Sequence, residues 1–452
     1  MRPKPLKEQP QDQLFKNRLC DELNPEHELI RLGKVIPWDQ IQADVEPLFT
    51  EGQSRPPLPT RLATGLMILQ HLYNVSDEAV VRAWVENPYW QAFCGYEFLQ
   101  WEFPAHPTSL TRWRQRLGSD GLEKVLKISI GVALKTKTVT APELEKAIVD
   151  TTVMPKAITH PNDAKLIQRI IERIVKASAR AGIALKRTFI RVSKRALRDY
   201  QRLMHGKRIK KARRPLRRLR RYLSKILEDL DPHLESCPRD LFKELVVGAK
   251  LLIQSKEDKN KIYSCHEPQV SCIAKGKAHK PYEFGAKACL VVTEKTGLAL
   301  TLTTHVGNPY DGHLLEEALC KAEEVTGVEI KRVLVDLGFR GHEVQNKQVL
   351  ISRTKGLIPS LKKALKRRQA IEPWIGHMKS DGKLGRCYLK GPTGDKIHGL
   401  LVAIAHNFRT ILRKLRLIYV WTLEWMCVLI ERLLEVNNRK NDWDGLGLMT
   451  EV

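Results

Sequence analysis

The stretch Lys146-Ala-Ile-Val-Asp150-Thr-Thr-Val153 decides the fold. A short run of apolar residues leads directly to an acid, which is typical of a buried strand that ends on a carboxylate. From about Pro59 onward, the preceding chain follows helical spacing instead, as in Arg61–Leu72 and after the capping residue Ser76. We therefore expect a second domain, of the α/β class, to begin at about residue 141.

A second strand of the same kind, Lys331-Arg-Val-Leu-Val-Asp336, also ends on an acid. Before it, Ala288–Thr293 and Leu298–Thr304 flank a four-residue turn and predict a hairpin, and Asp311 is expected to cap a helix that ends near Val325. After it come a strand at Gln348–Ser352 and a helix from Leu361 that carries Glu372. This element order is that of an RNase H-like mixed sheet with flanking helices.

The positions of three acids make this order informative. In such a sheet the first and fourth strands are neighbours, so Asp150, Asp336 and Glu372 are expected to converge. Phosphodiester chemistry suits such a cluster, because two Mg²⁺ ions about 4 Å apart can activate the attacking oxygen and stabilise the leaving one. Carboxylates are hard oxygen ligands that Mg²⁺ prefers. The alternative for each acid alone is an ordinary turn or cap residue.

The residues around Glu372 carry cations at helical spacing. Arg368 lies four residues before Glu372, and Lys379 lies seven after it, which places all three on one face of a continuous helix. Pro373 disfavours a helical Glu372, so we expect either a kink here or a helix that starts at Pro373 with Glu372 as its N-cap. His377 is a weaker candidate for proton transfer.

Residues 166–258 are predicted to form a helical insertion in an RNase H-like catalytic domain, which is expected to comprise residues 141–165 and 259–415. Two apolar stripes predict two long helices packed as a hairpin. Between Lys186 and Lys225, eighteen Lys or Arg residues face a single acid, Asp199. A solvated face would normally mix both signs, so we interpret this window as a surface for the DNA backbone. The candidate contacts are Arg213, Arg214, Arg217 and Arg218.

The N-terminal region, residues 1–140, is predicted to be a helical DNA-binding domain. The segment from Ser109 to Gly118 opens with a cap residue, ends on glycine and carries Arg112, Arg114 and Arg116. A short basic helix of this kind can lie in a major groove. A solvated amphipathic helix is the alternative.

Composition agrees with a nucleic-acid partner. The 452 residues include 77 Lys and Arg against 51 Asp and Glu, a formal charge of +26 that favours a polyanion. The nine cysteines are odd in number and scattered, so we interpret them as core residues of a reduced, cytoplasmic protein. The apolar stretch Leu417–Leu434 contains charges and is too short for a membrane span, so residues 416–452 are expected to form a helical tail.

Taken together, these motifs resemble the DDE transposases of bacterial insertion sequences, and within them the insertion sequence five family. Val149-Asp150-Thr-Thr-Val resembles the first catalytic motif and Asp336-Leu-Gly-Phe-Arg-Gly the second. The third motif, an Arg, three residues, Glu, six residues and Lys, is matched by Arg368 through Lys379. Leu365 departs from the family pattern, in which Tyr often stands at this position.

The resemblance implies that Asp150, Asp336 and Glu372 bind two Mg²⁺ ions, with Mn²⁺ as a substitute, and that Arg368, Lys379 and Arg340 lie near DNA. It also implies cleavage at terminal inverted repeats, strand transfer into target DNA by the freed 3′-hydroxyl, and a homodimer on DNA. Two alternatives stay open: an RNase H-like nuclease without strand transfer, and a non-catalytic basic DNA-binding protein from a degenerate element.

Overall fold

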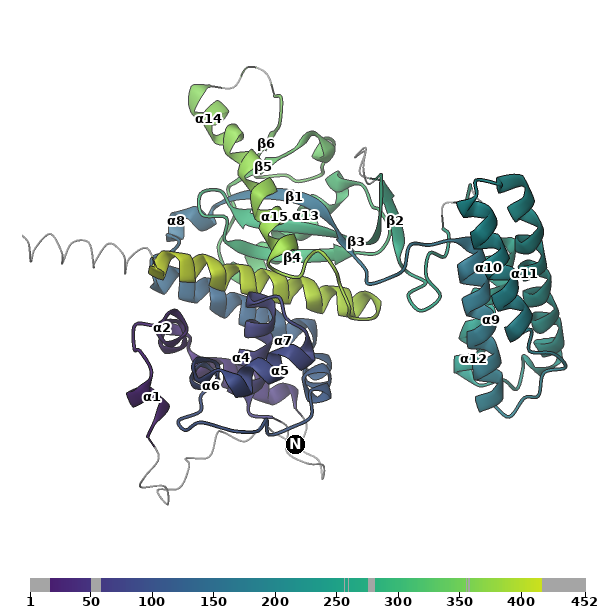
Figure 1. Cartoon of the computed structure of the whole chain (residues 1–452). Coiled ribbons are helices and arrows are strands. Elements are labelled where there is room, and N and C mark those ends of the chain that lie inside the picture. The colour runs from purple at the N-terminus through teal and green to yellow at the C-terminus, as the bar shows by residue number, and fades with distance from the viewer. Residues whose placement is uncertain are drawn as a thin grey trace, which may run out of the picture.

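The N-terminal part of the protein is a cluster of helices (Figure 1). The computed structural model describes residues 17–49, 58–255, 257–258, 260–274, 281–354, 356 and 358–416. The helices of this part are α1 (Leu19–Glu22), α2 (Glu28–Val35), α3 (Trp38–Val45), α4 (Thr60–Leu72), α5 (Asp77–Glu86), α6 (Pro88–Phe93), α7 (Thr108–Lys135) and α8 (Ala141–Leu144). Ser76 caps α5 as predicted, since its hydroxyl accepts a hydrogen bond from the Ala79 amide.

Helix α7 differs from the short helix predicted at Ser109–Gly118. Gly118 does interrupt the helical backbone, with φ of 64°, but the chain resumes helical geometry at once and continues to Lys135. Residues after the break, among them Leu122 and Leu126, are buried and hold the second half in place. The glycine therefore marks a kink between two helical segments.

The central sheet is mixed and six-stranded. Its strands are β1 (Lys146–Pro155), β2 (Ser271–Ala274), β3 (Tyr282–Thr293), β4 (Ala299–His305), β5 (Arg332–Val335) and β6 (Gln348–Ile351). The order is β2-β3-β1-β5-β6, and β4 pairs with β3. The strand β1 runs antiparallel to β3 and parallel to β5, so the strands that carry Asp150 and lead to Asp336 are neighbours. The predicted strands and the predicted hairpin are confirmed, but the expected end of the first strand is wrong. The strand β1 continues past Asp150, which is opposite Leu290, to Pro155, because β3 pairs with it over that whole length.

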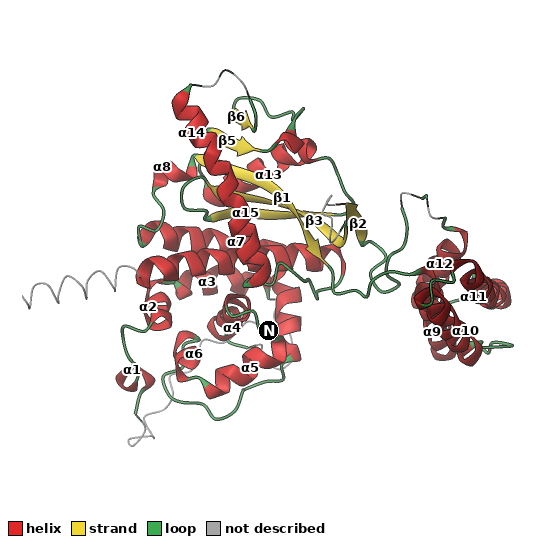
Figure 2. Ribbon diagram, turned by 45° about the horizontal axis from the view of Figure 1, so that its top comes forward, coloured by secondary structure: helices red, strands yellow, loops and turns green. Residues whose placement is uncertain are grey.

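Helices cover both faces of the sheet (Figure 2). The helix α13 (Asp311–Thr326) packs on β3 and β4, while α15 (Ile371–Ser380) contacts β1 and is preceded by α14 (Pro359–Arg367). A further helix spans residues 391–416 and lies between the sheet and the N-terminal helices. Asn407 of this helix fixes it there, because its side chain exchanges hydrogen bonds with the backbone of Ala299 and with the Ser129 hydroxyl.

The N-terminal helices and the sheet share one hydrophobic core. Leu66 of α4, Leu126 of α7, Val149 of β1 and Leu334 of β5 belong to the same buried cluster. The predicted boundary near residue 140 therefore separates two kinds of secondary structure but not two cores. By contrast, the insertion has a core of its own, formed by residues such as Ile170, Leu223 and Leu245.

The insertion contains four helices where the sequence predicts a hairpin of two. They are α9 (Asp163–Arg180), α10 (Ile190–His205), α11 (Ile209–Leu230) and α12 (Arg239–Ile253), and they stand apart from the sheet in Figures 1 and 2. A pair of helices alone would leave most of both apolar stripes in water, and α10 and α12 supply the missing cover. The prediction missed α10 because its few apolar residues are spaced among many charges.

Two smaller predictions are corrected. Cys20 and Cys320 are exposed, so they are not core residues, whereas Cys94, Cys265, Cys289 and Cys387 are buried. Cys427 and the predicted helical tail after residue 416 lie outside the described residues. Within the part of the chain that the structure describes, no helix is both long and apolar enough to span a membrane.

Candidate active site

Strand register places two of the predicted acids level with each other. In the parallel pair β1–β5, Lys146 is opposite Arg332 and Ile148 is opposite Leu334. Asp150 and Asp336 each follow two residues later, so they lie at the same level, Asp150 within β1 and Asp336 directly after β5. Because side chains alternate between the faces of a strand, residues that are both two positions further on project to the same face.

A single guanidinium contacts all three acids of the predicted triad, Asp150, Asp336 and Glu372, which we call the acidic cluster. Its Nη2 lies 3.1 Å from Oδ2 of Asp150 and 3.6 Å from Oδ2 of Asp336. Its Nη1 lies 3.6 Å from Oε1 of Glu372. These contacts come from Arg368. The three carboxylates, which are far apart in sequence, therefore converge around one cationic side chain.

Glu372 reaches the cluster through a break between two helices. The helix α14 ends at Arg367, a 3₁₀ turn spans Arg368–Ala370, and α15 begins at Ile371. Pro373 therefore occupies the first turn of α15, where a missing amide proton costs little because the first amides of a helix have no intrahelical acceptor. The alternative of a helix that starts at Pro373 is wrong, because Ala370 is the N-cap of α15 and Glu372 lies inside the helix.

Packing on the hairpin turn fixes the direction of α15. Gly297 in the β3–β4 turn has φ of 73°, and a Cβ atom there would come within 2.3 Å of the Trp374 ring. The indole thus lies directly on the glycine backbone. Since Trp374 is two residues after Glu372, this contact holds the first turn of α15 against the sheet.

Short backbone hydrogen bonds orient the two aspartates. Oδ1 of Asp150 accepts from the Thr151 amide at 2.8 Å. Oδ1 of Asp336 accepts from the Gly338 amide at 2.8 Å, which caps the 3₁₀ turn Leu337–Phe339. In both residues this contact leaves the other oxygen, Oδ2, directed at Arg368. Each aspartate is thus fixed through Oδ1 by a backbone amide, while its Oδ2 faces the Arg368 guanidinium.

A fourth carboxylate, Asp311, lies beside the cluster and was not predicted to belong to the site. A Cβ atom on Gly338 would be 2.9 Å from Oδ2 of Asp311 and 3.0 Å from Oδ1 of Asp336, so the two acids border the same glycine. The other oxygen of Asp311 accepts from Thr151 Oγ1 at 2.9 Å and pairs with Lys287 Nζ at 2.6 Å.

The predicted role of Asp311 is therefore corrected. Tyr310 is the N-cap of α13 and Asp311 is the first residue of the helix, with its carboxylate turned to Thr151 and Lys287 instead of to the helix amides. Since Thr151 follows Asp150 and points to the opposite face of β1, Asp311 supports the middle of this strand from the face opposite to Asp150. The sequence signal that could have found it is the segment Gly307-Asn-Pro-Tyr-Asp311, which places an acid between the predicted hairpin and the predicted helix.

The cluster has the donor chemistry of a divalent metal site, because its members are carboxylates and a cation already lies among them. Within the described ranges, however, no three acidic, histidine or cysteine side chains lie close enough together to hold one metal ion. Arg368 takes up the space between the acids. Its Nε is also buried without a hydrogen-bond partner among the described residues, so the guanidinium is not fully satisfied where it lies.

The remaining cations and histidine near the cluster are placed as follows. Lys379 is half-buried on α15, and Arg340 is exposed after the 3₁₀ turn, where its carbonyl accepts from the Tyr310 hydroxyl at 2.5 Å. His377 contacts Asp381, with 3.0 Å between Nδ1 and Oδ2. Its partner thus lies one helical turn further on, away from the three acids.

A buried cysteine, Cys289, also lies near Asp311 and Asp150. Burial raises the pKa of the Cys289 thiol, with Asp311 and Asp150 adding to the effect, so this cysteine stays protonated.

Of the three predicted arginines on α7, the structure leaves two for DNA. Arg112 and Arg116 are exposed, but Arg114 is only 5% exposed and its guanidinium is paired with Asp77 and hydrogen-bonded to Gln70. Arg114 therefore fastens α7 to α4 and α5, and its prediction as a DNA contact is corrected. On the insertion, Arg213, Arg214, Arg217 and Arg218 are all exposed on α11.

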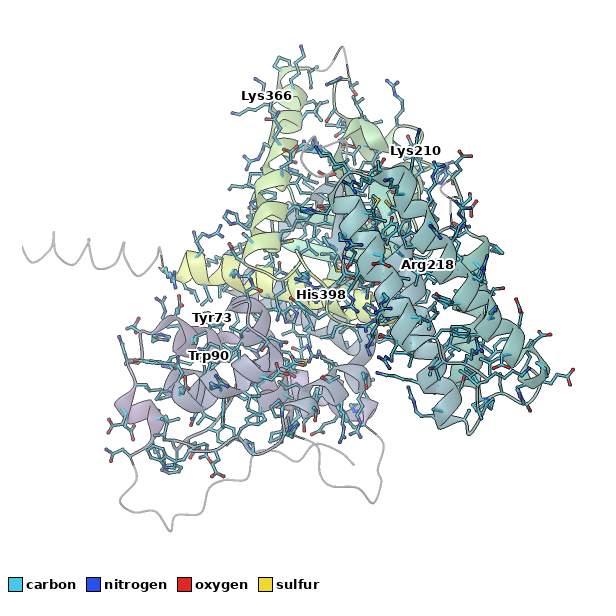
Figure 3. All side chains as sticks on the ribbon, turned by 45° about the vertical axis from the view of Figure 1, so that its right-hand side comes forward. Tyr73, Trp90, Lys210, Arg218, Lys366 and His398 are labelled. Carbon is cyan, nitrogen blue, oxygen red and sulfur yellow. The ribbon has the colours of Figure 1, made fainter. Side chains whose placement is uncertain are left out.

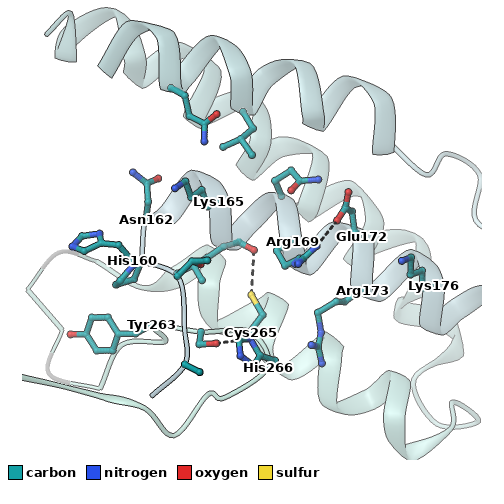
Figure 4. Close-up of a pocket in the computed structure, with 18 residues that line it drawn as sticks. His160, Asn162, Lys165, Arg169, Glu172, Arg173, Lys176, Tyr263, Cys265 and His266 are labelled. Atoms are coloured by element: carbon teal, nitrogen blue, oxygen red, sulfur yellow. Dashed lines mark hydrogen bonds and ion pairs between the residues drawn. The ribbon is translucent and has the colours of Figure 1, made fainter. Parts of the chain in front are cut away.

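A cavity of about 690 Å³ lies where the insertion joins the sheet, away from the acidic cluster (Figure 4). It is lined by the first turns of α9 and by the two connecting segments, with Lys165, Arg169 and His266 among its residues. Two of its arginines are paired, since Arg169 contacts Glu172 at 3.3 Å and Arg173 binds Glu244 through two nitrogens.

Two family models match the chain. A transposase domain (DUF772) matches residues 18–116, and a transposase DDE domain matches residues 256–408. The second range contains Asp336 and Glu372, while Asp150 precedes it on the other side of the insertion. The uncharacterized protein ORF8 in the nfe locus of Rhizobium meliloti is 43% identical over 194 residues, which cover 43% of this chain and 93% of that protein. No solved structure matches the chain.

Proposed function

Because this chain belongs to the DDE transposases, we propose that it cuts DNA at the ends of an insertion sequence and joins the freed 3′-hydroxyl to target DNA. The observation that carries this proposal is the convergence of Asp150, Asp336 and Glu372 on the Arg368 guanidinium. We further propose that the sheet is of the RNase H type, on the basis of its strand order and of two acids at the same level on adjacent parallel strands.

In this proposal Asp150, Asp336 and Glu372 would hold two Mg²⁺ ions, which would activate the attacking oxygen and stabilise the leaving oxygen. The protein's own contribution is to fix the acids before the substrate arrives. The hydrogen bonds from the Thr151 and Gly338 amides set two of them, and Trp374 on Gly297 sets the third. Such support matters because a catalytic group displaced by about 1 Å can lose its rate advantage.

Arg368 has a second part in the same proposal. A guanidinium binds phosphate in a bidentate manner, so a DNA phosphate at the cluster would be an alternative partner for it. When Arg368 turns from the carboxylates to a phosphate, the space between the acids becomes free for metal. Lys379 and the exposed Arg340 would add positive charge along the same DNA strand.

The other parts of the molecule complete the proposal. The N-terminal helices, with the exposed Arg112 and Arg116, would bind the transposon ends, and residues 141–165 and 259–415 would carry out catalysis. A homodimer on DNA would hold two ends together, and a cytoplasmic location follows from a substrate that is chromosomal DNA. Placement within the insertion sequence five family rests on the spacing from Arg368 to Lys379.

Strand transfer with purified protein tests the proposal. The substrates are labelled duplexes taken from the DNA that flanks the gene, supplied with Mg²⁺ or Mn²⁺ and a supercoiled target. We expect nicked and joined products from the wild type and neither product from Asp336→Asn. A binding assay on the same duplexes must show that Asp336→Asn still binds, so that lost activity is not lost folding.

Other outcomes would favour the alternatives. Nicks without any joined product, even from a precut end with a free 3′-hydroxyl, would identify a nuclease. DNA binding without nicks, equal in the wild type and in Asp150→Ala, would identify a non-catalytic DNA-binding protein. A direct readout of metal is Mn²⁺ binding without DNA, which should be weaker in Asp336→Asn and stronger in Arg368→Gln than in the wild type.

A further inference from the structure

One half of the surface of α11 is strongly basic as far as Lys225. The nine Lys and Arg residues of this helix lie on the half turned away from the bundle, with Arg220 half-buried, while Leu219, Leu223 and Ile226 on the other half are buried. The two acids of this half, Glu228 and Asp229, follow in the last turn. We call this half the α11 basic face; it comprises Lys210, Lys211, Arg213, Arg214, Arg217, Arg218, Arg220, Arg221 and Lys225. In Figure 3, where the bundle comes forward, Lys210 and Arg218 mark its course along the helix.

The charge of this face is not neutralised by the protein. Among the described residues, its ion pairs are confined to one contact, between Arg218 and Asp199 at 3.2 Å. Arg213, Arg214 and Arg217 are exposed and form no ion pair in this part of the chain. Some cations elsewhere on the bundle are paired, as in Lys194 with Glu172 at 3.2 Å and Arg173 with Glu244.

The arrangement is unfavourable for an isolated helix. Arg213, Arg217 and Arg221 succeed one another at intervals of four residues, and like charges at that spacing repel. The first turn also has no acid, although the positive end of the helix dipole lies there. A sequence that only needed a solvated helix would mix in acids, so the face is suited to a partner that brings negative charge.

We propose that the α11 basic face binds the phosphate backbone of duplex DNA. This inference rests on the proposed function in one respect, since it takes DNA as the substrate. The helix spans Ile209–Leu230, and its cations run from Lys210 to Lys225 over about 24 Å, which is about two thirds of one turn of duplex DNA. A row of cations of that length can follow the phosphates of a stiff duplex.

The structure also indicates what the face does not bind. Phe189 and Tyr222 stack on each other, with ring centroids 5.1 Å apart, and both are half-buried in the bundle. They are thus not free to stack on the bases of a single strand. An anionic membrane is disfavoured as well, because the apolar side of α11 is already buried in the bundle and cannot insert.

Duplex binding by the full-length protein tests the inference. The probe is a labelled 30-base-pair duplex of arbitrary sequence, titrated at several salt concentrations without divalent metal. We compare the wild type with Arg214→Glu/Arg217→Glu. We expect affinity for this duplex to fall by about tenfold or more, and the slope of log affinity against log salt to lose about 2, one for each phosphate contact.

The matched control is Lys243→Glu/Lys250→Glu, which makes the same change of charge at two exposed positions of α12. This pair should stay within about twofold of the wild type. Folding of the test variant is protected because each new Glu has a Lys or Arg four residues away on both sides, which favours the helix. Circular dichroism of both variants checks this directly.

Three results would overturn the inference: unchanged affinity and slope in Arg214→Glu/Arg217→Glu, equal losses in both double variants, or tighter binding to a single strand than to the duplex. Asp336→Asn separates this inference from the proposed catalysis. If that variant binds the duplex like the wild type and the α11 variant does not, duplex binding by the α11 basic face is supported whether or not strand transfer is observed.

Discussion

Gly338 shows at the scale of one residue why the second motif needs a glycine. A methyl group there would lie 2.9 Å from a carboxylate oxygen of Asp311 and 3.0 Å from one of Asp336. Contacts of that length force the neighbours to move, and here the neighbours are acids held by Lys287 and by the turn itself. We infer that the position is kept small so that Asp336 can hold its orientation.

Gly338→Ala is therefore expected to fold and to lose activity. Because Asp336 would be displaced, the rate of metal-dependent DNA nicking should fall by about tenfold or more, while duplex binding stays unchanged. The control is Gly376→Ala on α15, where a Cβ atom meets nothing within 4 Å. That variant should nick at the wild-type rate and gain roughly 0.5–1 kcal/mol in helix stability. Equal nicking by both variants would contradict the role assigned to Gly338.

At the scale of secondary structure, α11 combines an apolar half with a half whose charged residues are all basic as far as Lys225. The repulsion between Arg213, Arg217 and Arg221 makes a direct prediction about the helix itself. In Arg217→Glu, the interactions of this position with Arg213 and with Arg221 change from repulsive to attractive. The amides of α11 should therefore exchange with deuterium several-fold more slowly than in the wild type. The same change should weaken duplex binding.

Hydrogen exchange followed peptide by peptide checks this prediction. Peptides from α9 and α12 serve as internal references, because the substitution does not change the charge interactions within those two helices. Faster exchange in α11 would mean that Arg217 makes a stabilising contact inside the bundle, and the α11 basic face would then have a structural role.

At the scale of the whole molecule, buried histidines join parts that are distant in sequence. His406 on the 391–416 helix contacts the Gly297 carbonyl through Nε2 at 2.9 Å, and His398 contacts the Lys383 carbonyl at 2.9 Å. Burial lowers the pKa of both imidazoles to about 4. An unfolded histidine has a pKa of about 6.5, so the unfolded chain takes up protons first as the pH falls.

The protein should accordingly lose stability on acidification between about pH 6.5 and pH 4. Each of the two histidines contributes on the order of 2 kcal/mol to the difference between pH 7 and pH 5, because the unfolded state binds protons that the folded state excludes. Urea denaturation at the two pH values measures this. His406→Asn should reduce the difference, whereas His205→Gln, at an exposed position, should leave it unchanged.

Local pattern alone allowed the strands, the hairpin and the three candidate acids to be predicted. Each apolar run that ends at Asp150 or Asp336 is read from neighbouring residues, and so is the turn between β3 and β4. The spacing from Arg368 to Lys379 is also a local property. Such features depend on side-chain periodicity and turn chemistry, which act over a few residues and are visible in the chain itself.

Only the tertiary structure decided which residues that are far apart in sequence contact one another. Arg368 lies between the acids, and Asp311 accepts a hydrogen bond from Thr151. Arg114 is buried and paired with Asp77. The core of the insertion is formed by four helices and not by two. None of these contacts follows from spacing. Which groups meet depends on strand register, on where helices cross and on which apolar surfaces remain to be covered, and these are settled only when the whole chain packs.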